Sequence, residues 1–379
     1  MSFVSVVNTE SYDSNLLDQA VERHFSALCL EEKISADCKV VLKPNLLMKR
    51  TPEEFTTTHP EVVAAVIRKL QSLGVKQIVI ADSPGGPYTK QLLTGIYQAA
   101  GYTALANTYG VVLNTDVSYS SVERTENRFC KSFQVIQPLV EADFIINICK
   151  LKTHGMIGLS GAVKNMFGSV PGLMKPELHL RFPEKNRFCG MLVDLCQTVA
   201  PNVTFVDAVD AMEGDGPSGG IKKHVGMTLA AENPFDLDLI LCKIASLDPN
   251  TIFTVSHAKE RGLCAPSAES VRLVGDPLAV FPDFKRAASN DINFSKYVPK
   301  FIIERFSPRP VIRKSECVGC GKCAESCPAH TINIVGRKAK IDPSHCIKCY
   351  CCHEMCPVKA IEIRRTKLFD FGAKRARGK

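Results

Sequence analysis

Short apolar runs alternate with longer amphipathic stretches along about the first 245 residues of the chain. The runs, rich in Val and Ile, predict β-strands, whereas apolar residues at three- and four-residue spacing predict helices. The expected strands are Phe3–Val7, Lys39–Lys43, Gln77–Ala81, Asp143–Cys149, Val203–Val206 and Gly226–Ala230, and the expected helices are Ser14–Leu28, Pro60–Leu73, Thr89–Ala100, Arg187–Val199 and Asp236–Ala245. Strands separated by helices of this length favour an α/β fold with a mostly parallel sheet and flanking helices.

The clearest helix is Pro60–Leu73. Thr58 is the expected cap, Pro60 lies near the first turn, and Gly74 is expected to end the helix. Its predicted apolar stripe consists of Val62, Val63, Val66, Ile67 and Leu70. Residues 107–133 are polar and irregular, and we interpret them as an inserted hairpin or loop region.

A cysteine pattern occurs twice near the end of the chain, with a constant offset of 29 residues. Each copy reads C-x2-C-x2-C-x3-C-P, and the segments after the two prolines also match, Ile332 and Ile334 against Ile361 and Ile363. This repeat resembles the bacterial two-cluster ferredoxins with no ligand missing, and it implies two similar halves. The paired motif predicts a small α+β domain that binds two [4Fe-4S] clusters.

In such a motif three thiolates on one loop reach three irons of a cubane, and the fourth cysteine begins a short helix that points to the other cluster. The first cluster is therefore assigned to Cys317, Cys320, Cys323 and Cys356, and the second to Cys346, Cys349, Cys352 and Cys327. A zinc site is the alternative. Zinc sites are built from C-x2-C pairs, however, and do not require the third and fourth cysteines that precede a proline in both copies of this motif. Cys351 falls outside the pattern and is either a packed thiol or the position of a misassigned ligand.

Length, hydropathy and cysteine usage bear on the number of domains, on membrane insertion and on cellular location. At 379 residues the chain predicts two to three domains. We expect no membrane span, because no apolar run reaches 18 residues. The N-terminus lacks a secretory pattern, and the eight cysteines outside the repeat form no framework, so we expect a cytoplasmic protein in a reducing, low-oxygen cell.

The formal net charge is +8, and residues 364–379 hold seven Lys/Arg against one Asp. This basic tail is either a solvated end or a docking segment for an acidic partner. A nucleic-acid role has little support, since no recognition motif accompanies the charge. The expected domains are 1–280 (α/β), 281–310 (a proline-rich linker with a short helix near Tyr297–Phe306), 311–363 (ferredoxin type) and 364–379 (tail).

Polar residues follow four of the predicted strands, where ligands bind in open parallel sheets. The segments are Lys43-Pro-Asn45, Asp82-Ser-Pro-Gly-Gly86, Lys150-Leu-Lys152-Thr-His154 and Asp207. The second suits an anion-binding turn, or simply a tight turn. In the third, the alternation of an extended strand places Lys150, Lys152 and His154 on one face, which suits a carboxylate or phosphate, or a solvated strand end.

Two glycine-flanked segments add candidates. Residues 161–168 carry Lys164 and Asn165 and are followed by Lys175 and His179, in a connection typical of a functional loop. Residues 207–220 carry Glu213 on a glycine-rich stretch, for which ordinary turn chemistry is the alternative. Asp82, Asp207 and Glu213, with His154 or His179, could bind a metal or act as acid–base groups.

These strings resemble the domain-of-unknown-function family 362 over roughly residues 1–280. The resemblance rests on Lys-Pro-Asn at 43–45, Asp-Ser-Pro-Gly-Gly at 82–86, Lys-x-His-x11-Asn-x2-Gly at 152–168 and Asp-Ala-x3-Met-Glu-Gly-x-Gly-Pro-x2-Gly at 207–220. Members are often joined to a ferredoxin-type domain. The resemblance implies that these are motif residues, and no reaction can be carried over.

Our first functional hypothesis is an iron–sulfur oxidoreductase that passes electrons to a small anionic substrate at the strand edge. The anion would be held by Lys43, Asn45, Lys152, His154 and Lys164, while Asp82, Asp207 or Glu213 would transfer protons or ligate a metal. A second hypothesis is a non-enzymatic electron carrier or maturation protein serving a redox partner protein, and a third gives the clusters a structural role. No flavin, nicotinamide or molybdenum fingerprint is evident, so two [4Fe-4S] clusters are the cofactors predicted.

Overall fold

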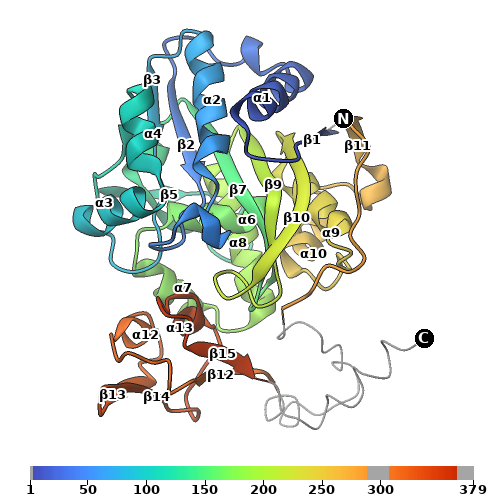
Figure 1. The fold of residues 1–379 in the computed structure, drawn as a ribbon. Helices are drawn as coiled ribbons and strands as arrows, with labels where there is room; N and C mark the ends of the chain where they lie inside the picture. Colours follow the sequence, from blue (N-terminus) through green and yellow to red (C-terminus); the bar gives the residue numbers. More distant parts are fainter. Residues whose placement is uncertain (1–2, 288–306, 365–379) are drawn as a thin grey trace.

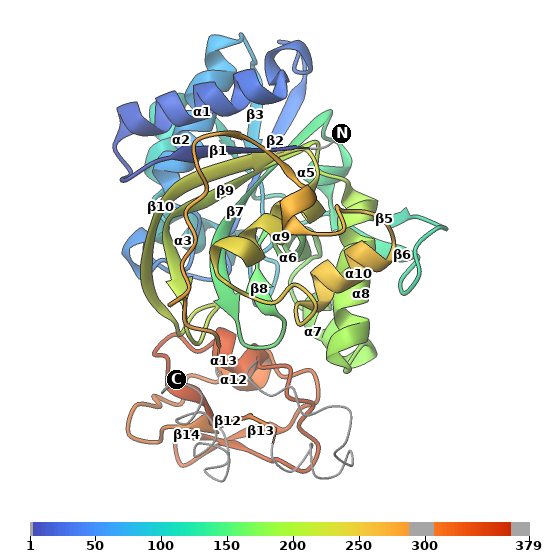
Figure 2. The same ribbon diagram turned by 90° about the vertical axis from the view of Figure 1, so that its right-hand side faces the viewer.

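The computed structural model describes residues 3–287 and 307–364. They form a large α/β domain and a small cysteine-rich domain, which lies at one end of the large sheet (Figures 1 and 2). The expected helix near Tyr297–Phe306 and the basic tail after Arg364 lie outside the described residues.

The large domain is built on a nine-stranded sheet in the order β11-β1-β10-β9-β7-β2-β3-β4, with β8 paired to β7. Its strands are β1 (Phe3–Asn8), β2 (Lys39–Pro44), β3 (Gln77–Ile80), β4 (Val112–Leu113), β7 (Phe144–His154), β8 (Gly158–Ser160), β9 (Val203–Glu213), β10 (Ile221–Ala231) and β11 (Arg272–Gly275). Most neighbours pair in parallel, whereas β10 runs antiparallel to β1 and β9, and β8 antiparallel to β7. The predicted mostly parallel α/β fold is confirmed.

Helices cover both faces of this sheet (Figures 1 and 2). One face packs against α1 (Ser14–Leu28), α2 (Pro60–Ser72), α3 (Lys90–Ala99) and α4 (Tyr102–Tyr109). The other packs against α6 (Ala162–Asn165), α8 (Lys185–Val199), α9 (Pro234–Ile244) and α10 (Phe253–Glu260). Shorter elements are η1 (Leu30–Glu32), η2 (Pro52–Glu54), α5 (Gln137–Val140), η3 (Met166–Ser169), α7 (Met174–Arg181) and η4 (Ala268–Ser270).

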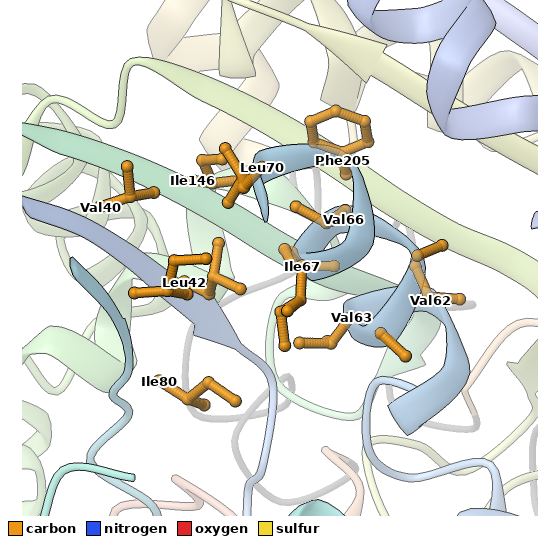
Figure 3. Close-up of a cluster of buried hydrophobic side chains, with 14 of the residues drawn as sticks. Val40, Leu42, Val62, Val63, Val66, Ile67, Leu70, Ile80, Ile146 and Phe205 are labelled. Carbon is orange, nitrogen blue, oxygen red and sulfur yellow. The ribbon is translucent and has the colours of Figure 1, made fainter. Parts of the chain in front are cut away.

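Helix α2 shows how the core forms. Its predicted apolar stripe packs against side chains of β2, β3, β7 and β9 (Figure 3). Each such side chain contributes about 1.5–3 kcal/mol when fully buried. The expected cap was wrong: Pro60 is the first helical residue, so His59 is the N-cap and its side chain accepts from the Glu61 N–H. The Thr58 hydroxyl instead donates to the carbonyl of Ile148.

Strands β7 and β9 are longer than their apolar runs predict. They end at His154 and Glu213 rather than at Cys149 and Val206, and both are buried throughout. The pairing shifts register between Lys150 and Lys152. The polar residues remain in extended chain because other parts of the protein supply their hydrogen-bond partners. The predicted insertion at 107–133 begins in the last turn of α4 and includes β4 and β5 (Tyr119–Glu123), which forms a hairpin with β6 (Ser132–Ile136).

The small domain repeats its backbone as well as its sequence. It pairs β12 (Arg309–Ile312) with β15 (Ile361–Arg364) and β13 (Ile332–Val335) with β14 (Lys338–Ile341), and it has two short helices, α12 (Lys322–Glu325) and α13 (Cys351–Glu354). Positive φ angles recur 29 positions apart, at Gly319 and Lys348, Gly321 and Tyr350, and His330 and Lys359. The two halves therefore have matching loop geometry.

Candidate functional site

Two cysteine-lined cavities lie inside the small domain. Cys317, Cys320, Cys323 and Cys356 line the first, of about 320 Å³. Cys327, Cys346, Cys349 and Cys352 line the second, of about 310 Å³. The structure therefore brings together the two sets that the spacing predicts, with Cys327 and Cys356 exchanged between the halves.

The residues around these cavities fit iron–sulfur clusters. Backbone N–H groups of Thr331, Ala339 and Ala360 point at sulfur atoms, at 3.4 Å from Cys327, 3.4 Å from Cys317 and 3.2 Å from Cys356. Such hydrogen bonds stabilise thiolates. Within residues 3–287 and 307–364 no three His, Cys, Asp or Glu side chains are grouped to hold one metal ion. Four thiols spread around a cavity suit a cubane, in which each iron takes one thiolate.

A third cavity, of about 730 Å³, lies between the two domains. Its large-domain wall comes from the ends of β2, β3 and β7 and from the connection through α6, η3 and α7. Its other wall comes from the small domain. The large-domain residues include Asn45, Asp82, Ser83, Lys152, His154, Lys164, Phe167, Lys175 and His179, and the small-domain residues are Ser326, Cys351, Glu354 and Met355. We call this space the interdomain cavity.

A buried ion pair forms part of its floor. Lys43 Nζ lies 2.7 Å from Asp82 Oδ1, and both side chains are buried. The second oxygen of Asp82 accepts from the Leu46 N–H at 3.0 Å. A side chain at Gly168 would collide with this pair, which explains the glycine there. Lys43 and Asp82 therefore neutralise each other.

Three further lysines line the cavity without a carboxylate partner in the described ranges. Lys152 Nζ donates to Asn45 Oδ1 and the Thr56 carbonyl, both at 2.6 Å. Lys175 Nζ donates to Ser83 Oγ at 2.9 Å and to a backbone carbonyl at 3.0 Å. Burial lowers the pKa of both Lys152 and Lys175 to about 7.

The third is Lys164, which is half-buried. Its Nζ lies 4.4 Å from the centroid of the Phe167 ring. Burial lowers the pKa of Lys164 too. Weak pairing of three cations around one space makes the cavity electropositive.

A histidine and a carboxyl group meet where the two domains touch. His154 Nε2 lies 3.2 Å from Glu354 Oε1, and His154 Nδ1 accepts from the Met156 N–H at 3.1 Å. Burial lowers the pKa of His154, so the ring is neutral, and its proton must sit on Nε2, facing Glu354. Burial raises the pKa of Glu354. Sequence reasoning missed Glu354, because nothing in the cysteine spacing marks it.

Two predicted residues lie elsewhere. Asp207 is held by Lys150 Nζ at 2.9 Å, the Tyr12 hydroxyl at 2.9 Å and the His59 N–H at 2.9 Å. Glu213 accepts from the Lys285 N–H at 3.0 Å. Neither lines the interdomain cavity. Of the seven proposed catalytic residues, Asp82, Lys152, His154 and Lys164 meet at the cavity, and Lys43 contacts it through Asp82.

The cavity adjoins the second set of cysteines. Ser326 and Cys351 line it, and each is the chain neighbour of a cysteine of that set, Cys327 and Cys352. Cys351 lines the interdomain cavity and does not line the second cysteine cavity, so its position differs from those of the eight predicted ligands.

Comparisons with known proteins agree with the division of the chain into a large and a small domain. Residues 40–243 match the family model described as "Domain of unknown function (DUF362)", and residues 309–357 match that of a "4Fe-4S dicluster domain". A curated relative, a thylakoid-associated protein of Synechocystis sp., is 32% identical over 269 residues, which cover 70% of this chain and 81% of the relative. None of the helices in the described ranges has the length and apolarity to cross a membrane. The cytoplasmic location stays a prediction.

Two solved structures are weakly similar. The lactate racemase apoprotein from Thermoanaerobacterium thermosaccharolyticum has a TM-score of 0.38 at 12% identity, covering 54% of this chain and 50% of that chain. A protein from Thermotoga maritima has a TM-score of 0.36 at 12% identity, covering 58% and 56%. This chain thus spans about half of each, and so weak a likeness says nothing about its chemistry.

Proposed function

Because the chain belongs to the family described as domain of unknown function DUF362 and carries a 4Fe-4S dicluster domain, we propose that it is an iron–sulfur oxidoreductase. Its substrate is a small anionic molecule bound in the interdomain cavity. The cysteines around the two smaller cavities hold two [4Fe-4S] clusters, which supply one electron each when bound.

The observation that carries this proposal is the set of lysines in the cavity. Burying a cation without a carboxylate partner costs several kcal/mol per ion. Lys152 and Lys175 are buried, Lys164 is half-buried, and all three face one space. A bound carboxylate or phosphate would offset this cost and form charge-assisted hydrogen bonds with them. The cavity is therefore arranged for an anion.

The chain's own residues also place protons there. Lys152 and Lys175 each have a pKa near 7, so at neutral pH each can donate or accept a proton. His154 holds a proton on Nε2 at the same wall. Leu47, Phe167 and Met355 add apolar surface to the lining, and a less polar surrounding strengthens electrostatic interactions inside the cavity.

Electron delivery from the small domain fits the same geometry. The wall residues Ser326 and Cys351 are the residues directly before Cys327 and Cys352 in the chain. An acceptor in the cavity would therefore lie on the side of the small domain that holds the second set of cysteines. Two one-electron centres in one domain suit a two-electron reduction.

The proposal is tested by anaerobic reoxidation kinetics. The protein is reduced with dithionite, freed of excess reductant and mixed with 2-oxo acids, 2-enoates and phosphorylated ketones, while the cluster absorbance is followed. We expect a rate that saturates with the concentration of at least one compound. In Lys164→Met the half-saturating concentration should rise about tenfold, equivalent to about 1.4 kcal/mol of lost binding.

The matched control is Lys314→Met, an exposed lysine of the small domain, which should behave as wild type. If every compound reacts at a rate that is linear in concentration and equal in all three proteins, electrons do not leave through the cavity. The chain would then be an electron carrier for a partner protein, the second hypothesis from the sequence.

A further inference from the structure

The first cysteine cavity opens onto an apolar surface. Four aliphatic side chains there are unusually exposed: Val318 (58%), Ile334 (40%), Val335 (61%) and Val358 (42%). Three of them, Val318, Ile334 and Val358, line the cavity itself. Cys320 lines it too and is the one exposed cysteine among the eight predicted ligands. We call Val318, Cys320, Ile334, Val335 and Val358 the cluster face.

Packing of the β13–β14 hairpin on the first cysteine loop makes this face continuous. The Ala339 N–H donates to Cys317 Sγ at 3.4 Å, and Lys338 Nζ donates to the Cys317 carbonyl at 2.5 Å. Gly319 lies against the Arg337 carbonyl so closely that a side chain would collide with it. The first cysteine loop and the β13–β14 hairpin, which carry Val318 and Val335, therefore pack directly against each other.

The small domain has more basic than acidic side chains. Residues 309–364 contain ten Lys/Arg and five Asp/Glu. The acidic residues nearest the loop are already paired, Glu316 with Arg313 at 2.6 Å and Glu325 with Lys322 at 2.9 Å. Arg337 and Lys340, on the hairpin, are exposed and form no ion pair with any described residue. Unpaired cations beside an exposed apolar patch are typical of a protein interaction site.

We propose that the cluster face is the docking site of an acidic, low-potential electron-donor protein. The step is one electron per encounter: the donor is oxidised by one electron, the first cluster is reduced by one, and no atom is transferred. The interdomain cavity lies beside the second cluster, and the cluster face lies over the first. Electrons thus enter at one cluster and leave from the other, so this inference concerns electron uptake and does not depend on the cavity's substrate.

An exposed apolar patch with cations near it fits a transient redox interface. Electrostatic steering accelerates such encounters, and salt weakens it. An anionic membrane surface would also attract cations, but it has no need of an exposed cluster ligand. The exposed Cys320 therefore favours a redox partner.

Stopped-flow reduction tests this directly, with an acidic flavodoxin in its hydroquinone form as the probe. We expect a second-order rate constant that falls steeply as sodium chloride is added. In the double variant Arg337→Glu/Lys340→Glu the rate constant at low salt should fall at least tenfold, and Val335→Ser should lower it several-fold. Reduction by dithionite should be unchanged, which shows that the clusters are intact.

The matched control is Lys76→Glu/Lys131→Glu, which changes the net charge equally at two exposed lysines of the large domain. It should retain a rate constant within twofold of wild type. Equal losses in both double variants, or no dependence on salt, would overturn the proposal. So would binding to phosphatidylglycerol vesicles that Arg337→Glu/Lys340→Glu abolishes while flavodoxin reduction continues as in wild type. These outcomes need no substrate, so they are separable from failure of the proposed function.

Discussion

At the residue scale, the two buried lysines Lys152 and Lys175 are expected to lower the stability of the large domain. Lys152 and Lys175 donate hydrogen bonds only to neutral oxygens, and the nearby carboxylates offset only part of their desolvation, so burial lowers their pKa values to about 7. A binding site often contains a group whose burial is costly when the site is empty and whose charge is compensated when a ligand binds. The lysines thus connect the stability of the fold to occupancy of the cavity.

The pH dependence of stability follows from these two lysines. Their pKa is about 7 in the folded protein and about 10.5 when unfolded, so between these values the unfolded chain binds more protons. The free energy of unfolding should therefore rise from pH 7 to pH 9. Lys175→Met should raise the stability at pH 7 by on the order of 1–4 kcal/mol and flatten this rise, as measured by thermal unfolding. If Lys175→Met had a lower Tm than wild type at pH 7, and its stability rose with pH as steeply as that of wild type, burial of Lys175 would not be destabilising.

Cys349 and Cys351 lie two positions apart, but replacing each with serine should have a different effect on cluster content. Cys349 lines the second cysteine cavity, whereas Cys351 lines the interdomain cavity. Cys351→Ser should therefore retain both clusters, and Cys349→Ser should lose about half of the iron and sulfide. Iron and sulfide analysis of the two purified variants decides this. Loss of a cluster in Cys351→Ser alone would mean that the ligand assignment is wrong at this position.

At the element scale, the site depends on strands and turns that approach unusually closely. The segment η3 passes over the end of β3 at Gly168, where any side chain would overlap the Asp82 carboxylate. Apolar runs predicted the position of β7 and β9 but not their length. The predicted strand stopped at Cys149, because the partners of Lys150 and Lys152, which are Asn45, Thr56 and Asp207, are distant in sequence.

Gly168→Ala tests this close approach. The added methyl group would displace Asp82 or Lys43, so we expect a loss of about 1–3 kcal/mol of stability and weaker anion binding. Gly95→Ala is the control, since Gly95 lies in α3 with nothing within 4 Å of the new methyl group. It should be stabilising by about 0.5–1 kcal/mol, because alanine favours helices. Equal thermal stability of the two variants would refute the packing argument.

At the scale of the whole molecule, docking of the small domain completes the interdomain cavity. Arg50 donates to the carbonyls of Cys356 and Pro357, both at 3.0 Å, and Ser218 Oγ donates to the Glu354 carbonyl at 3.1 Å. The sequence repeat predicted the small domain and the division of its eight ligand cysteines into two sets. It could not predict Ser326, Glu354 and Met355 as cavity residues, because no periodicity in either domain encodes their contact.

Arg50→Ala should loosen this docking. Loss of charged hydrogen bonds to two carbonyls costs about 1.5–3 kcal/mol per bond. We expect faster iron release to a chelator and easier proteolysis between the domains. Arg23→Ala is the control: it removes an exposed ion pair with Asp276, which contributes at most about 1 kcal/mol. Identical iron-release rates in the two variants would mean that Arg50 does not hold the domains together.

The central claim is that this chain carries two [4Fe-4S] clusters in adjacent cavities, one of them beside the interdomain cavity. The most direct measurement is anaerobic iron and sulfide analysis combined with low-temperature EPR of the dithionite-reduced protein. We expect about eight irons and eight sulfides per chain, and EPR signals split by spin coupling between two reduced cubanes. Zinc without sulfide, or a single uncoupled cluster, would contradict it.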